Sequence, residues 1–283
     1  VHSVRGYDDE GAILIRQSIE SAADCSAPDL IVAGYRELGY VDALAGRRPE
    51  AADHLDQAGA VAQDADARAG ILSVTGFNLV DWGKVGSGLD RFEASLEQAR
   101  EAQNRRREVW SLGIGAWGQL AAGNLDTAQI WLDQCIDHVA ELNWLGFRPW
   151  PLALRSEAQL RLGARPDKVR DSLFETFALS CQIGDPCWEA TAARAIALTY
   201  AAEKDLPLAI EWLEQARKRC TRDTDHYAGM LVNIYADHAD LCLQAGRTEQ
   251  ANALARELLS LAARTHMDSF IPKAVQIIDA SAA

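Results

Sequence analysis

The stretch that decides the fold is residues 35–58, YRELGYVDALAGRRPEAADHLDQA. It contains a large residue, a Leu-Gly step, a turn glycine and then small or apolar residues at helical spacing: Tyr35, Leu38, Gly39, Gly46, Ala51, Leu55 and Ala58. Apolar positions that recur every three or four residues on both sides of a glycine are typical of two amphipathic helices joined by a tight turn. The stretch therefore predicts an antiparallel helix pair.

The same arrangement recurs along the chain. Equivalent turn residues are Gly46, Gly83, Gly123, Gly163, Lys204 and Gly246, and successive members lie 37, 40, 40, 41 and 42 residues apart. Seven residues before each turn stands a small residue, as close approach of neighbouring helices requires: Gly39, Gly76, Ala116, Ser156, Ala197 and Ala239. A regular period of this length indicates a repeat array.

The prolines agree with this division. Pro49, Pro166 and Pro207 each fall three residues after a turn, and the other five lie near inferred helix starts, where the ring is tolerated. We therefore predict an all-α, right-handed superhelix that forms one domain over residues 1–283. It comprises a half-repeat at 8–24, six antiparallel helix pairs over 29–265, and a capping helix at 271–281.

With these residues identified, the chain resembles the tetratricopeptide repeat family, although its units are longer than that family's 34 residues. Phrases such as AQIWLDQC at 128–135 and AIEWLEQA at 209–216 resemble the sensor arrays of signal-transduction ATPase regulators of the maltose-activator type, with a LuxR-type DNA-binding end. The resemblance implies an ATPase domain before the array and a helix-turn-helix domain after it. The start at Val1 rather than Met suggests a fragment or a processed product.

Composition excludes several classes of function. The formal charge of −13 repels a phosphate backbone and an anionic membrane surface, so we expect no direct nucleic-acid binding and no membrane association by this segment. No apolar run is long enough for a membrane helix, and we expect a cytoplasmic protein. The six cysteines lack zinc spacing, so we expect reduced thiols and no metal or cofactor.

Catalytic motifs are also missing from the sequence. Four histidines directly follow an aspartate, for example at Asp53-His54, but neighbours on a helix point about 100° apart and do not form a base and its orienting group. The nearest imitation of a phosphate loop, Gly83 to Gly88, lacks the terminal Lys-Ser pair. We therefore expect no enzymatic activity from this segment, with an all-helical enzyme as a remote alternative.

Tryptophan is the informative residue type, with eight copies. Trp131 and Trp212 occupy equivalent places on second helices, where packing between repeats explains them. The register of the first helices predicts a second group, together with charged residues, on the concave face: Arg36, Tyr40, Phe77, Trp110, Trp117, Trp150, Glu157 and Arg194. An aromatic floor with a few polar groups suits a peptide, protein or small-molecule ligand. The alternative is that these rings pack between helix layers.

These observations lead to a binding function. The first hypothesis is the sensor or interaction segment of a bacterial transcriptional regulator, whose ligand occupies the concave groove. The alternative is a stand-alone adaptor that binds a peptide or protein partner.

Overall fold

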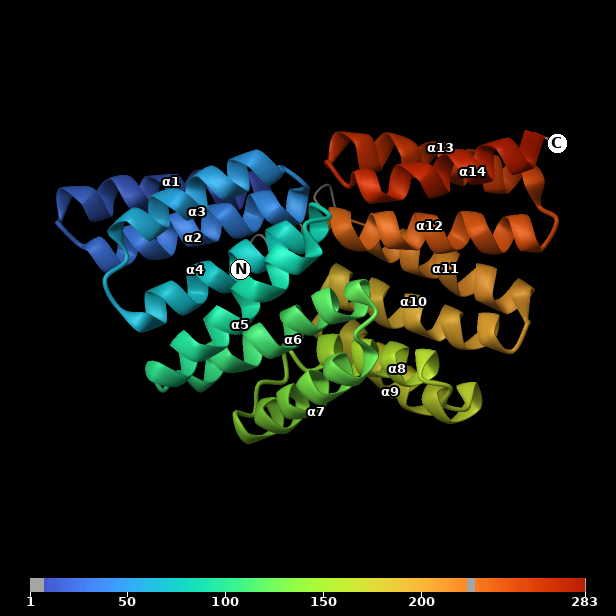
Figure 1. Ribbon diagram of the computed structural model, residues 1–283, viewed down its shortest axis with the longest axis horizontal. Helices are drawn as coiled ribbons and strands as arrows, with labels where there is room; N and C mark the ends of the chain where they lie inside the picture. The colour runs from blue at the N-terminus through green and yellow to red at the C-terminus, as the bar shows by residue number, and fades with distance from the viewer. Residues whose placement is uncertain (1–7, 223–226, 283) are drawn as a thin grey trace.

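The computed structural model describes residues 8–222 and 227–282, and within them it is helical, with no strand. Figure 1 shows the helices in order along the chain. They are α1 (Asp8–Asp24), α2 (Pro28–Ala45), α3 (Arg48–Val61), α4 (Ala65–Asp81), α5 (Val85–Glu101), α6 (Arg105–Ala122), α7 (Leu125–Glu141), α8 (Pro149–Arg161), α9 (Pro166–Ile183), α10 (Pro186–Ala202), α11 (Leu206–Cys220), α12 (Ala228–Gln244), α13 (Thr248–Arg264), a 3-10 helix (Asp268–Phe270) and α14 (Ile271–Ala282).

Local sequence chemistry explains where the helices begin and end. Proline occupies one of the first two positions of α2, α3, α9, α10 and α11, where its missing N–H costs nothing. All six predicted turn residues have a positive φ, from 66° at Lys204 to 91° at Gly163. Glycine adopts this backbone conformation without steric cost, so it ends the first helix of a pair and starts the return. The predicted superhelix of six helix pairs is confirmed.

Small residues let the two helices of a pair approach closely. A Cβ at Gly39 would lie 2.7 Å from Cγ of Leu55, and one at Gly76 would lie 2.9 Å from the carbonyl oxygen of Gly88. Real Cβ atoms do not tolerate such distances. In the first two pairs, packing therefore requires glycine at the position seven residues before the turn.

The pairs are arranged in an inner and an outer layer. Each even-numbered helix from α2 to α12 packs against the next even-numbered helix, whereas α3 and α5, α5 and α7, and α7 and α9 show no comparable packing in the described part of the chain. Helices on the inside of a curved stack lie closer together than those on the outside. The first helix of every pair therefore faces the inside of the superhelix.

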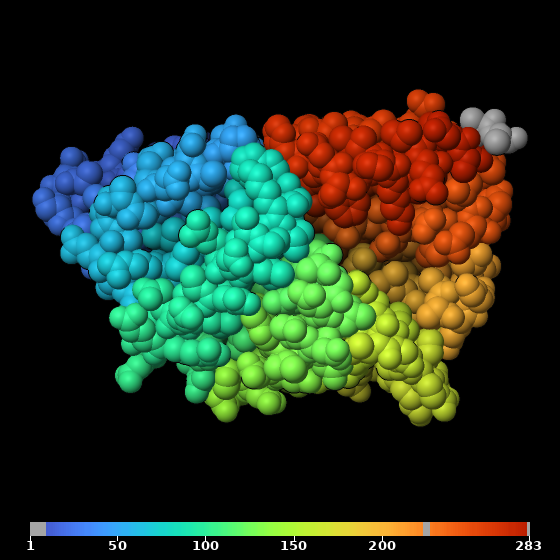
Figure 2. All heavy atoms as spheres, viewed as in Figure 1, coloured from blue at the N-terminus to red at the C-terminus, as the bar shows by residue number. Residues whose placement is uncertain are grey.

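The curvature is strong enough to bring the two halves of the array together. Gly46, in the turn between α2 and α3, lies against the C-terminal half: a Cβ there would be 2.7 Å from Cβ of Thr265 and 3.3 Å from Cβ of Ala228. Figure 1 shows α13 and α14 beside the N-terminal helices along one edge, and Figure 2 shows their atoms in contact with those of the N-terminal half. We call this contact the closure.

Candidate functional site

The structure separates the eight residues predicted for the concave face into three groups. All eight lie on inner-layer helices. Arg36, Tyr40 and Trp110 keep part of their surface exposed. Phe77 and Trp150 are buried in the core, and Trp117, Glu157 and Arg194 line a pocket beside the closure.

Phe77 and Trp150 do not form part of an open floor. Phe77 is 3% exposed and Trp150 is 1% exposed, and both rings contact Tyr227, at 5.3 Å and 6.4 Å between ring centroids. The indole N–H of Trp150 donates a hydrogen bond to the carbonyl of Gly113, at 2.9 Å. Tyr227 directly precedes α12, so the C-terminal half itself fills the inside of the superhelix at this point. For these two residues the packing alternative is correct.

A buried carboxylate joins the halves of the array. Asp81 accepts hydrogen bonds from the indole N–H of Trp117 (3.1 Å) and the hydroxyl of Tyr227 (3.3 Å), and it pairs with Arg48 at 3.5 Å. Arg48 is fully buried and also donates to the carbonyls of Ala43 (2.6 Å) and Thr265 (3.4 Å). Burial raises the pKa of Asp81, although Arg48 and the two hydrogen bonds oppose the shift.

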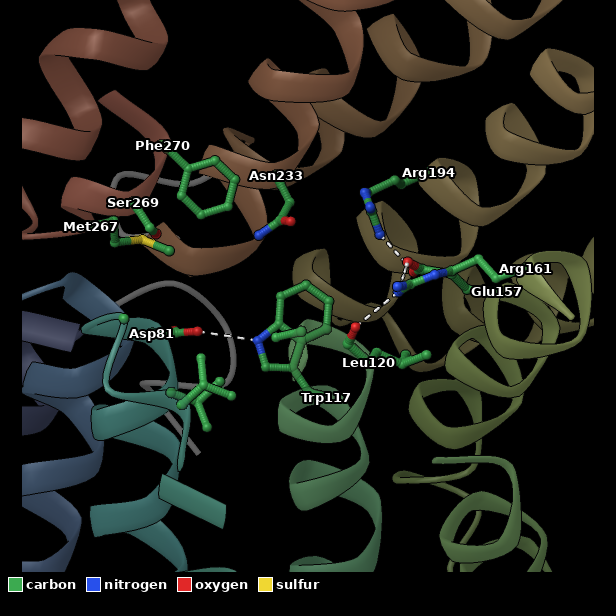
Figure 3. Close-up of a pocket in the computed structure, with 14 residues that line it drawn as sticks. Asp81, Trp117, Leu120, Glu157, Arg161, Arg194, Asn233, Met267, Ser269 and Phe270 are labelled. Atoms are coloured by element: carbon green, nitrogen blue, oxygen red, sulfur yellow. Dashed lines mark hydrogen bonds and ion pairs between the residues drawn. The ribbon is translucent and has the colours of Figure 1, made fainter. Parts of the chain in front are cut away.

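The pocket lies between the two halves and has a volume of about 390 Å³. Figure 3 shows Asp81 and Trp117 on the N-terminal side, Asn233 and Phe270 on the C-terminal side, and Glu157 and the two arginines at one end. The lining residues come from five inner-layer helices, from the turn before α5 and its first residue, and from the segment between α13 and α14: Val80, Asp81, Gly83, Val85, Trp117, Leu120, Ala121, Glu157, Arg161, Arg194, Asn233, Met267, Ser269 and Phe270. Such a mixture of apolar walls and a few polar groups is typical of a ligand site.

The charges around the pocket are largely paired with one another. Arg194 binds Glu157 at 2.8 Å and Asp237 at 2.7 Å, and Arg161 lies 3.7 Å from Glu157 and donates to the carbonyl of Leu120 at 2.9 Å (Figure 3). Burial lowers the pKa of Arg194, but Asp237 and Glu157 outweigh it, and the pKa stands above its usual value. Arg161 keeps 40% of its side chain exposed, so it is the charged group best placed to meet a ligand.

The described residues contain no group of three or more His, Cys, Asp or Glu that could hold a metal ion. The hydrogen bond of His54 is to a residue other than its sequence neighbour Asp53, because His54 Nδ1 lies 2.7 Å from Asp42. That pair is on the α2–α3 unit and does not line the pocket.

Sequence reasoning missed several pocket residues. Asp81 and Arg161 both lie two positions before a turn, as does Ala121, so one register position supplies three of the lining residues. Charged residues at that position of the repeat are a signal that could have identified them. Met267, Ser269 and Phe270 carry no such signal, because they follow the last helix pair.

No protein-family model and no curated protein matches the sequence. Solved structures do match the fold. The structure of NprR in complex with its cognate peptide NprX has a TM-score of 0.70 at 13% identity, over 95% of this chain and 82% of that chain. A Rap protein complexed with competence and sporulation factor has a TM-score of 0.60 at 13% identity, over 88% and 76%.

A third structure belongs to the type of protein that the sequence resembles. It is a signal-transduction ATPase with numerous domains and a tetratricopeptide repeat sensor, from Pyrococcus horikoshii, with a TM-score of 0.54 at 12% identity. The alignment covers 98% of this chain and 44% of that chain, so this chain matches less than half of the ATPase. Together these structures confirm that the chain has the tetratricopeptide-like fold. Among its described helices none is long and apolar enough to span a membrane.

Proposed function

We propose that this chain is a peptide- or protein-binding repeat domain whose ligand occupies the pocket beside the closure. The observation that carries the proposal is the origin of the lining: Asp81 and Trp117 come from the N-terminal half, and Asn233 and Phe270 from the C-terminal half. A ligand held between them contacts elements that are distant in the sequence. Such a ligand stabilises the closed superhelix relative to an open one.

The comparisons support a peptide as ligand. Two of the similar arrays are described as complexes, one with a cognate peptide and one with competence and sporulation factor. Trp117 presents an indole ring to the pocket, and Phe270, Met267 and Val80 complete an apolar wall. Aromatic walls of this kind accept an apolar side chain, and Asn233 and Arg161 offer polar groups to its backbone.

The proposal extends to a sensor role in a bacterial transcriptional regulator. Similarity of fold to the sensor array of a signal-transduction ATPase supports this assignment. In such a protein, ligand binding at the closure would change the relative positions of the two ends of the array. The equilibrium between the conformations of the domains attached to those ends would then shift, because a ligand favours the conformation that it binds more tightly. No catalytic role is proposed for this segment.

A peptide selection tests the proposal. A displayed library of random peptides would be selected on the purified chain, and the affinity of selected peptides measured by isothermal titration calorimetry. Trp117→Ala should weaken binding by about 30-fold, as loss of a central aromatic anchor does. Trp212→Ala is the matched control, since Trp212 packs against Phe174 and Phe177 away from the pocket. Equal losses in both variants, with both folded by circular dichroism, would refute the pocket as the binding site.

A further inference from the structure

A second surface on the inner layer lies apart from the pocket and combines arginines with partly exposed aromatic rings. None of its residues lines the pocket. They come from α2, the start of α6 and the segment after α7. We name it the arginine–aromatic surface, and it consists of Arg36, Tyr40, Arg106, Arg107, Trp110 and Trp144.

Two of its arginines converge on one point of the inner layer. Gly70 is buried in α4, and a Cβ at this position would lie 3.0 Å from Cδ of Arg36 and 3.0 Å from Cζ of Arg107. The absent side chain thus leaves the space that both arginine side chains occupy. The side chain of Arg36 and the guanidinium of Arg107, from different helices, thus approach the same point, and clustered arginines favour an anionic ligand.

The rings form a continuous row beside these arginines. Tyr40 meets Trp110 edge to face at 5.6 Å between centroids, and Trp110 stacks on Trp144 at 6.4 Å. The guanidinium of Arg106 lies 4.9 Å from the centre of the Trp144 ring. Phe147 is buried beneath and stacks with both tryptophans, so the row is supported from the core side.

The local charge opposes that of the whole chain. Glu37 pairs with Arg36 at 2.6 Å and Asp66 pairs with Arg107 at 3.3 Å, while no carboxylate of the described residues forms an ion pair with Arg106. Of these three arginines only Arg106 is without a paired carboxylate among the described residues, so the three arginines and their two partners carry a net positive charge on a protein with a net charge of −13. A negatively charged partner that is repelled by most of the molecule is therefore attracted here.

We propose that the arginine–aromatic surface binds an acidic peptide segment that carries at least one aromatic or aliphatic side chain. The apolar side chain packs on Trp110 and Trp144, and the carboxylates pair with Arg106 and with the two arginines over Gly70. Charge-assisted pairs to arginine and burial of an apolar side chain act together at this surface. The proposal goes beyond the pocket ligand and does not depend on it.

Fluorescence anisotropy with three labelled synthetic peptides tests the proposal. One peptide alternates Glu with Trp and Leu, a second has Lys in place of every Glu, and a third keeps Glu but has Ser in place of the apolar residues. The first should bind most tightly, with an affinity that falls as salt increases. Equal binding of the Lys peptide, or no detectable binding of the first peptide, overturns the proposal. So does tighter binding of a single-stranded oligonucleotide, for which arginines and exposed tryptophans also form a platform.

Variants locate the binding on this surface. Trp144→Ala should weaken the acidic peptide by about 30-fold and Arg106→Ala by about 5-fold to 10-fold with a reduced dependence on salt. Gly70→Ala retains every charge but displaces both arginines, so it should weaken binding while leaving the chain folded. Arg165→Ala is the charge control, because Arg165 is 75% exposed at the start of α9. If Trp117→Ala abolishes binding of this peptide and Trp144→Ala does not, the surface proposal fails and the pocket proposal stands.

Discussion

Gly229, in the first turn of α12, lies directly against the carboxylate of Asp81 at the end of α4. A Cβ at position 229 would overlap Oδ2 of Asp81. The second residue of α12, in the C-terminal half, thus touches the buried acid of the N-terminal half, 148 residues earlier in the sequence. This contact of the closure requires a glycine at position 229.

We predict that Gly229→Ala destabilises the closure, although alanine is intrinsically the better helix former. Overpacking against Asp81 should lower the free energy of unfolding by about 1–3 kcal/mol. Gly59→Ala in α3 is the matched control, because no atom lies within 4 Å of its added methyl group, and it should stabilise by up to about 1 kcal/mol. Urea unfolding measures both, and small-angle scattering should show a larger radius of gyration for Gly229→Ala only. A stabilised Gly229→Ala variant would contradict the prediction.

The ion pair between Arg48 and Asp81 yields a second prediction. Both side chains are buried, so Asp81→Asn leaves the charge of Arg48 without its carboxylate. We expect a loss of about 3–5 kcal/mol in the free energy of unfolding. The double variant Arg48→Met/Asp81→Asn should lose less free energy of unfolding than the two single variants together, because it also removes the buried charge of Arg48 that would be left without a partner. Additive losses in urea unfolding would show that the pair is not coupled.

His238 predicts how stability depends on pH. It is fully buried in α12, neither ring nitrogen has a hydrogen-bond partner among the described residues, and burial lowers its pKa to about 4. Glu214 raises the pKa, whereas Arg217 and Arg247 lower it. The unfolded chain takes up a proton near its ordinary pKa of 6.5 while the folded chain stays neutral, so this contribution to stability is present above pH 6.5 and is lost as pH falls toward 4.

His238→Leu should remove the loss of stability that His238 causes as pH falls from 6.5 toward 4. At pH 7 the variant and the parent should have similar stabilities, and near pH 4 the variant should be more stable relative to the parent by on the order of 3 kcal/mol. Thermal unfolding across this range, compared between the two proteins, measures the difference. If the two proteins lose stability in parallel as pH falls, His238 does not cause the predicted pH dependence of stability.

The pocket can be blocked without disturbing the core. Ala121 is exposed at the end of α6 and lines the pocket, whereas its neighbour Ala122 is exposed and does not. Ala121→Trp should fill the entrance and reduce the affinity of a selected pocket peptide by at least about 10-fold, since the ligand must then displace the added ring. Ala122→Trp should bind as the parent does. Unchanged binding by Ala121→Trp would place the peptide elsewhere.

Lys204 is the one non-glycine among the six turns, and its φ of 66° is costly for a residue with a Cβ. Lys204→Gly should therefore stabilise the chain by about 0.5–1 kcal/mol, after the added flexibility of the unfolded chain is taken into account. Glu203 has a φ of −84°, which is not strained, so Glu203→Gly relieves no backbone strain and should destabilise the chain. Differential scanning calorimetry distinguishes the two, and a lower melting temperature for Lys204→Gly would contradict the prediction.

The repeat register predicts which residues of the candidate site lie on the inner layer, but it does not predict which of them stay uncovered. Trp117 and Glu157 both lie six positions before a turn, and they line the pocket because the turn sets the helix register. Phe77 shares that position, yet Tyr227 covers it. Nothing in the repeat pattern indicates which inner positions the opposite half will cover.

The sequence by itself determined the six helix pairs, since a turn glycine and the apolar period around it act over a few residues. Only the tertiary structure decided that the superhelix closes on itself. Arg48 meets Asp81 and Thr265, which follow it by 33 and 217 residues, because small rotations between successive pairs accumulate along the whole array. Such a sum cannot be read from any one repeat. It is the closure that buries Asp81, places Tyr227 over Phe77 and forms the pocket between the two halves.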